Sequence, residues 1–124
     1  MKIYCGTDII ETERIKESIE KQGKTFLEKV YTKKEIEYCE NKKAQKYQHY
    51  AARFAAKEAT FKAISKIVDK YSVTWTDIEI TNQEDGRPLV NILSKDIKNI
   101  ESMDITLSHI KDYATATAVI LLKD

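Results

Sequence analysis

A glutamate interrupts an apolar stripe in the segment RFAAKEATFKA, residues 53–63. Counted in helical steps, position 58 completes a series with alternating spacings of four and three, formed by Tyr47, Ala51, Phe54, Phe61, Ser65 and Val68. The residue at that position is Glu58. Because an unpaired carboxylate away from water is costly, we expect a cation to meet Glu58 there.

Two lysines flank this carboxylate on adjoining faces of the same helix. Lys57 lies about 100° around the helix from Glu58, and Lys62 lies one turn further on. The string K-E-x-x-x-K taken alone favours an ion-paired, solvated helix surface. Glu58, and partly Lys57, share the arc of the apolar stripe, and this position argues against that alternative.

A second carboxylate, Asp8, follows Gly6 at the expected end of the first strand, directly before a helix. Two interpretations stay open, an N-terminal helix cap and a metal ligand. Two carboxylates from separate elements suit Mg²⁺, which takes one or two protein carboxylates, several waters and substrate phosphate oxygens. With Asp8 and Glu58 as ligands, Lys57 and Lys62 offset the charge of a phosphorylated substrate.

Two tripeptides carry further polar groups. GRP, at Gly86, Arg87 and Pro88, is a turn whose arginine could face an anion, although a plain hairpin turn is the better interpretation of this motif alone. LSH ends a strand with Ser108 and His109, which by themselves are more often incidental. No nucleophile elbow, P-loop or G-x-G-x-x-G motif is present, which argues against an ATPase or a Rossmann dinucleotide site.

The composition is that of a globular protein of one domain, residues 1–124. The formal net charge of +1 gives no global sign of nucleic-acid binding. No apolar run approaches the roughly 18 residues of a membrane span, and the first residues do not read as a signal peptide. Cys5 and Cys39 lack metal-ligand spacing, so we expect two free thiols and a cytoplasmic location.

Periodicity predicts an α+β fold with helices packed on a largely antiparallel sheet. The expected helices cover residues 11–23, 32–43 and about 44–69. The first of these ends at Gly23, and the second begins with a capping box of Thr32 and Glu35.

The expected strands cover residues 2–10, 73–82, 87–93, 103–109 and 113–122. Asp85 and Gly86 predict a hairpin between the second and third of them. Gly6 predicts that another backbone or a ligand comes close to the first strand. The strand order stays open.

The chain as a whole resembles the holo-acyl-carrier-protein synthases, the small stand-alone group of 4′-phosphopantetheinyl transferases. The similarity lies in four motifs with matching order and spacing, GTDIIETERI, RFAAKEATFKA, GRP and LSH. The resemblance implies transfer of the phosphopantetheine arm of coenzyme A to a serine of apo acyl carrier protein, with release of adenosine 3′,5′-bisphosphate.

The resemblance also implies roles for single residues. Asp8 and Glu58 match Mg²⁺ ligands, so the metal would be the cation that meets Glu58. Lys57 and Lys62 match basic residues around the coenzyme A diphosphate. Gly86, Arg87 and Pro88 match a turn along the coenzyme A nucleotide. Ser108 and His109 match a segment that touches its phosphates. Arg14 matches a basic residue that faces the carrier protein.

These roles imply a mechanism. A metal bridging the diphosphate withdraws charge from the attacked phosphorus, while Lys62 and His109 meet charge that develops on the leaving group. Asp8, Glu58 and Lys62 thus form the expected catalytic set. Glu58 is also the candidate base for the serine proton, although metal ligation lowers its basicity.

The carrier protein is expected to dock on the first helix and the residues after it. Arg14, Lys21 and Lys24 could meet an acidic helix, with Phe26 and Leu27 as the apolar centre. The alternative is a solvated amphipathic helix whose basic residues bind nothing. Family members of this length are similar in forming trimers with shared active sites, and residues 113–122 form a strand able to bury both faces.

Two departures from the family pattern stand out. Lys62 and Ala63 are followed by ISKIVDKY, without the glycines of many relatives, so we expect the helix to continue. Thr106 stands where relatives often have serine.

Two rival functions follow from the same residues. A non-catalytic module could bind a nucleotide or an acidic partner through the lysines, and it would still bind after Asp8→Ala. An RNA-binding domain that stacks bases on Tyr47, Tyr50 and Phe54 is disfavoured, because these aromatics lie on the stripe expected in the core.

Overall fold

Three long antiparallel strands form the sheet that carries Asp8: β1 (Lys2–Glu11), β5 (Tyr113–Leu122) and β4 (Ile100–His109). The computed structural model describes residues 1–69 and 72–124. The strand order is β1-β5-β4, so the C-terminal strand is central. Ala116 pairs with Asp8 on one side and with Leu107 on the other, which places these three residues in one row across the sheet.

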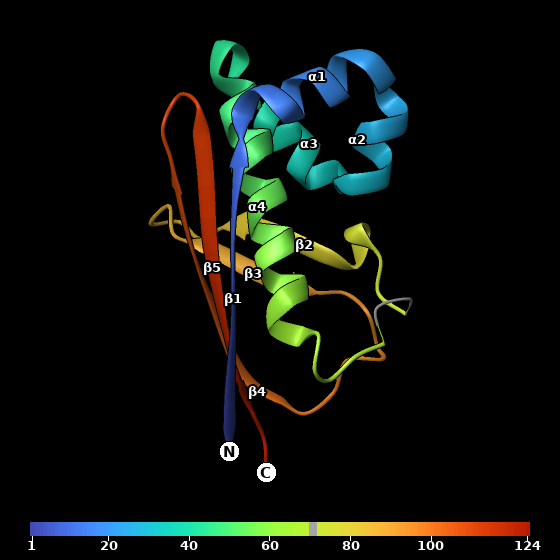
Figure 1. The fold of residues 1–124 in the computed structure, drawn as a ribbon, viewed down its shortest axis with the longest axis vertical. Coiled ribbons are helices and arrows are strands. Elements are labelled where there is room, and N and C mark those ends of the chain that lie inside the picture. The colour runs from blue at the N-terminus through green and yellow to red at the C-terminus, as the bar shows by residue number, and fades with distance from the viewer. Residues whose placement is uncertain (70–71) are drawn as a thin grey trace.

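Helix α4 (Lys46–Ile64) crosses one face of this sheet, which we call the inner face (Figure 1). Small side chains allow the close approach, since the contact buries Ala51, Ala55, Ala59 and Ala63 of the helix and Ala114, Ala116 and Ala118 of β5. A Cβ atom at Gly6 would clash with the carbonyl oxygen of Ala59 and lie 2.7 Å from the amide nitrogen of Ala63. The expected close approach at Gly6 is therefore confirmed.

The expectation that the long helix continues to about residue 69 is wrong. Helix α4 ends at Ile64, and the chain goes on in turns, in which the Ile67 amide donates to the Ile64 carbonyl at 3.0 Å. The Ser65 hydroxyl donates to the Lys62 carbonyl at 2.8 Å. The apolar spacing after Ala63 misled because Ile67 and Val68 pack against the core from turns rather than from a helix.

The expected buried stripe is only partly correct. Ala51 is fully buried, but Phe54, Glu58 and Phe61 are half-buried. The deepest face of α4 is the alanine face, because only small side chains fit against the sheet. The ring centroids of Phe54 and Phe61 lie 4.8 and 5.4 Å from that of Trp75, so this stripe, with Glu58 in it, borders the core.

The predicted hairpin is confirmed as β2 (Ile78–Asn82) and β3 (Pro88–Ile92). Gly86 has φ of 87°, a left-handed conformation that glycine adopts without strain. Its amide donates to the Gln83 carbonyl at 2.9 Å. Strand β2 starts later than expected, because a 3₁₀ turn, η2 (Trp75–Asp77), precedes it with a capping box of Thr74 and Asp77.

Three short helices gather at one end of α4, α1 (Thr12–Gln22), α2 (Lys24–Val30) and α3 (Lys33–Glu40), and a 3₁₀ turn, η1 (Lys43–Gln45), leads from them into α4 (Figure 1). The predicted end of α1 at Gly23, with φ of 56°, and the capping box of Thr32 and Glu35 are confirmed. Helix α2 was not predicted from the sequence, and no side chain caps its start. A second core joins these helices to α4, with Ile15, Ile19, Val30, Tyr31, Cys39 and Tyr50.

Two further expectations concern the chain as a whole. Cys5 is an exposed free thiol and Cys39 a buried one, as expected. Within residues 1–69 and 72–124, no helix has the length and apolar character needed to cross a membrane.

Candidate active site

Asp8 faces α4 from the middle of β1. The expectation that it ends the strand is wrong, because β1 continues to Glu11 and the N-cap position of α1 belongs to Glu11. The helix-cap interpretation of Asp8 is thereby removed. The Asp8 side chain has 17% of its surface exposed, and Lys62 Nζ lies 3.3 Å from its Oδ1.

Lys62 reaches β1 from the last turn of α4. Its Nζ also donates to the Thr7 carbonyl at 2.9 Å, while the side chain keeps 54% of its surface exposed. A cavity of about 340 Å³ opens at this point, lined by Thr7, Asp8, Ile9, Lys62 and Thr115. The ammonium group is thus held beside Asp8 and is open to solvent.

Glu58 lies one turn before Lys62 and completes the cluster. Burial raises the pKa of Glu58, the charge of Asp8 raises it further, and Lys62 lowers it. Within the described part of the chain, its carboxylate has no hydrogen bond or ion pair. Two carboxylates and one ammonium give the site a net negative charge, and the Glu58 carboxylate is the group that lacks a partner among the described residues.

This donor set fits a hard divalent cation. No group of three or more His, Cys, Asp or Glu side chains suited to a metal occurs among the described residues. Zinc usually needs such a group, whereas Mg²⁺ takes one or two carboxylates and completes its shell with water and phosphate oxygens. Asp8 and Glu58 are therefore the residues that could hold Mg²⁺.

Lys57 does not belong to this cluster, which corrects its expected place beside a diphosphate. Its side chain is completely buried, and its Nζ lies 2.6 Å from Glu35 Oε1. The same Nζ donates to the carbonyl groups of Trp75 at 2.9 Å and Ile78 at 2.7 Å. The ammonium group thus has its partners inside the protein and faces away from solvent.

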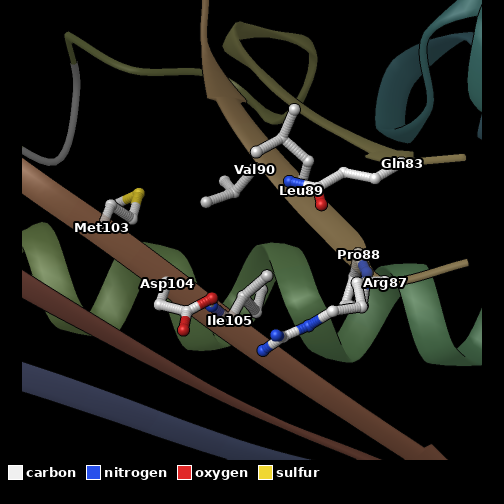
Figure 2. Close-up of a pocket in the computed structure, with 8 residues that line it drawn as sticks. All are labelled: Gln83, Arg87, Pro88, Leu89, Val90, Met103, Asp104 and Ile105. Carbon is white, nitrogen blue, oxygen red and sulfur yellow. The ribbon is translucent and has the colours of Figure 1, made fainter. Parts of the chain in front are cut away.

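The hairpin turn projects Arg87 over a separate cavity. This cavity of about 220 Å³ lies between β3 and β4 and is lined by Gln83, Arg87, Pro88, Leu89, Val90, Met103, Asp104 and Ile105. Figure 2 shows the Arg87 side chain extending from the hairpin toward β4, where Asp104 lies. Arg87 is exposed and available to an anion, which is compatible with the prediction that Arg87 could face one.

Ser108 and His109 are adjacent in β4, and their side chains leave opposite faces of the sheet. Both residues line a cavity of about 180 Å³, together with Ile9 and Tyr113. The ring centroid of His109 lies 5.2 Å from that of His49 on α4. Both residues therefore border one cavity at the end of β4, although their side chains leave the strand on opposite faces.

The sequence analysis missed one cationic group near His49, the ring that contacts His109; this group is Arg53. Arg53 is 2% exposed, its guanidinium stacks 3.7 Å from the ring centroid of Tyr38, and it donates to Asn82 Oδ1 at 2.5 Å. Asn82 Nδ2 in turn donates to the Gly86 carbonyl at 3.0 Å. Arg53 is the first residue of the segment RFAAKEATFKA. Its position on the buried arc of the helix was the sequence signal that could have identified it.

The expected docking residues lie on α1 and α2. Arg14, Lys21 and Lys24 are exposed. Phe26 and Leu27 are half-buried against the second core, and the Phe26 ring lies 6.2 Å from that of Tyr31. The patch is therefore more basic and less apolar than the sequence suggested.

Comparisons with known proteins agree on one family. The model of the 4′-phosphopantetheinyl transferase superfamily matches residues 4–118. The holo-[acyl-carrier-protein] synthase of Ruminiclostridium cellulolyticum is 47% identical over 129 aligned positions, covering 100% of this chain and 96% of that protein.

Solved structures give the same result. The Bacillus anthracis holo-(acyl-carrier-protein) synthase, in complex with CoA (3′,5′-ADP), superposes with a TM-score of 0.79 at 30% identity, covering 98% of this chain and 96% of that chain. The Helicobacter pylori holo-[acyl-carrier-protein] synthase, in complex with coenzyme A, superposes with a TM-score of 0.83 at 28% identity, covering 94% of this chain and 99% of that chain.

Proposed function

The chain belongs to the 4′-phosphopantetheinyl transferase superfamily, and we propose that it transfers the 4′-phosphopantetheine arm of coenzyme A to a serine of apo acyl carrier protein. The observation that carries this proposal is the cluster of Asp8, Glu58 and Lys62, in which Asp8 and Lys62 line an open cavity. It combines a place for a divalent cation with a solvent-exposed ammonium, which is what displacement at a diphosphate requires.

In the proposed reaction, the serine Oγ forms a bond to the phosphorus that bears the pantetheine arm. The bond from this phosphorus to the bridging oxygen breaks, and adenosine 3′,5′-bisphosphate leaves. Mg²⁺ held by Asp8 and Glu58 would supply charge neutralisation on the diphosphate. Lys62, being half exposed, can turn from Asp8 toward the leaving group and stabilise its growing negative charge.

Glu58 is the proposed acceptor of the serine proton. Burial and the neighbouring Asp8 charge raise the pKa of Glu58 in the metal-free protein, which favours its role as a base, while a bound Mg²⁺ would lower this pKa. The path is either direct or through a water, and the proton leaves Glu58 after the arm has been transferred.

A second part of the coenzyme A site is proposed around His109 and the hairpin turn. Arg53, His109 and Arg87 would meet the phosphates of the nucleotide, with Gly86 and Pro88 along it and Ser108 near its edge. Support comes from the contacts that link Arg53 through Asn82 to the Gly86 carbonyl, because they hold Arg53 beside the hairpin turn.

These two parts favour an active site shared between subunits of a homotrimer. Lys62 and Asp8 meet on the β1 side of α4, whereas His109 lies on β4, on the far side of the central strand. Strand β5 lies between the two groups, and we propose that a neighbouring chain supplies His109 and the hairpin to each site. The outer face of the sheet has apolar side chains for such an interface, including Ile3, Ile9 and Val119, which are 69%, 68% and 40% exposed.

The carrier protein is proposed to dock on the exposed basic residues Arg14, Lys21 and Lys24, with Phe26 at the margin. Coenzyme A and acyl carrier protein act in the cytoplasm, and two free thiols agree with a reducing compartment. We therefore place the protein in the cytoplasm as one domain that serves lipid synthesis.

The deciding experiment measures the intact mass of apo acyl carrier protein after incubation with the protein, coenzyme A and Mg²⁺. The expected gain is one phosphopantetheine arm, with adenosine 3′,5′-bisphosphate as the second product. Asp8→Asn, Glu58→Gln and a chelator should abolish the gain, while Glu101→Gln, an exposed carboxylate on β4, should keep it. Binding of coenzyme A without any mass gain would instead favour a non-catalytic binding module.

A further inference from the structure

An aromatic ladder crosses the N-terminal part of α4 and ends at the proposed phosphate site. We define it by Tyr38 of α3, His49 of α4 and His109 of β4. The ring centroids of Tyr38 and His49 lie 5.6 Å apart at an interplanar angle of 72°. Those of His49 and His109 lie 5.2 Å apart at 64°, so both contacts are edge-to-face.

Two cationic groups pack on the first ring of the ladder, Tyr38. Lys42 Nζ lies 4.7 Å from the ring centroid of Tyr38, and the Arg53 guanidinium lies 3.7 Å from it. Burial lowers the pKa of His49 to about 4, and the charges of His109, Lys42 and Arg53 act in the same direction. His49 is therefore a neutral ring at neutral pH, whereas His109 is exposed to solvent at the end of the ladder.

We propose that His49 is a positioning residue for His109, whose imidazole it holds edge-to-face at the proposed phosphate site. A neutral ring attracts an adjacent imidazolium, whereas a second imidazolium would repel it. The ladder therefore holds the His109 ring at its exposed end, where an anionic ligand can reach it. The ligand in this inference rests on the proposed function, but the contact between the rings does not.

The first test uses nuclear magnetic resonance of the two imidazoles, which are the only histidines in the chain. Nuclear Overhauser contacts between their ring protons are expected, and no such contact would overturn the proposal. Adding adenosine 3′,5′-bisphosphate as the probe should perturb the ring signals of His109 and leave His49 neutral. Protonation of His49 on addition of the probe would also overturn it.

The second test separates positioning from a structural role by kinetics. His49→Ala should raise the KM for coenzyme A roughly two- to tenfold, the range that one aromatic contact supports, with little change in kcat. His49→Phe retains a neutral ring and should restore the KM. Gln48→Ala, the neighbouring position on α4, is the matched control and should behave as the unmodified protein.

The outcomes are distinct from those of the proposed function. An unchanged KM for coenzyme A and unchanged His109 ring signals in His49→Ala would show that His49 does not position His109. If His49→Ala fails to fold, His49→Gln provides a second variant without the ring, and the Overhauser contact in the unmodified protein still decides. A protein that transfers no arm would refute the proposed function, while the contact between the two rings would still be measured.

Discussion

Lys57 and Glu35 form an ion pair of 2.6 Å in which neither side chain has exposed surface. Glu35 also accepts hydrogen bonds from the backbone amides of Thr32 and Ile80, each at 2.8 Å. Together with the two carbonyl partners of Lys57, these bonds tie α3, α4, β2 and η2 to one point. The residue next to Glu58 is thus an anchor of the fold and not a ligand contact.

We expect removal of one member of this pair to destabilise the protein strongly. Lys57→Met or Glu35→Gln leaves a buried charge without its partner, which costs about 3–5 kcal/mol. The double variant should recover part of this loss, because no uncompensated charge remains. Urea unfolding measures the free energies, and Lys46→Met, which breaks the exposed pair with Glu40, should cost about 1 kcal/mol or less. A loss in Lys57→Met no larger than in this control would contradict the prediction.

Gly6 is expected to tolerate no side chain. The added methyl group of Gly6→Ala would meet backbone atoms of α4 at Ala59 and Ala63, and backbone cannot give way as a flexible side chain can. Overpacking of this kind typically costs about 1–3 kcal/mol. Cys5→Ala, at the exposed neighbouring position, is the control and should unfold near the wild-type midpoint in the same thermal or urea experiment. Equal stability of the two variants would mean that β1 and α4 lie further apart.

Much of the fold could be predicted from local signals. The period of two in residues 103–109 and 113–122, the Asp85-Gly86 turn and the capping box at Thr32 each act over a few residues, and all three are confirmed. The end of α4 could not be predicted, because Ile67 and Val68 keep helical spacing while they pack from turns. The placement of β5 in the centre depends on long-range pairing, which periodicity does not encode.

The candidate site was likewise predictable only where local signals in the sequence were sufficient. Asp8, Glu58 and Lys62 were singled out by spacing and charge, and the structure brings Asp8 and Lys62 into contact. Lys57 was misassigned, because its partner Glu35 lies 22 positions away in the sequence and was assigned only to a capping box. The contribution of His49 was missed, since its contact with His109 requires the packing of α4 beside β4.

The stability of the protein should fall in acid because of His49. Its pKa is lowered to about 4 in the folded state, against an ordinary value of 6.5, so the unfolded chain binds the proton more readily between these values. Stability should therefore decrease as the pH falls from about 6.5 toward 4. We expect about 1 kcal/mol between pH 7 and pH 5, after allowance for solvent screening. In urea unfolding, His49→Phe should lose less stability over this range, and an equal loss would assign the effect to other groups.

Metal binding should depend on both carboxylates of the candidate site. In isothermal titration with Mg²⁺ and coenzyme A, Asp8→Asn and Glu58→Gln should each weaken metal binding, because each removes one anionic ligand. Turnover should fall on the order of 10²-fold or more in each variant. Unfolding curves close to wild type would show that the loss is local. Wild-type metal affinity in Asp8→Asn would exclude Asp8 as a ligand.

Charge reversal on α1 should weaken productive binding of the carrier protein without affecting coenzyme A. Arg14 is exposed, with Lys21 and Lys24 exposed further along, so Arg14→Glu replaces an attraction to an acidic partner by a repulsion. We expect the KM for apo acyl carrier protein to rise roughly three- to tenfold at low salt, with an unchanged KM for coenzyme A. Lys98→Glu, an exposed lysine between β3 and β4, is the control and should leave both values unchanged. The difference between Arg14→Glu and wild type should shrink in roughly 0.5 M salt, since exposed charges are screened there. A KM for the carrier protein that is insensitive both to Arg14→Glu and to salt would place the docking surface elsewhere.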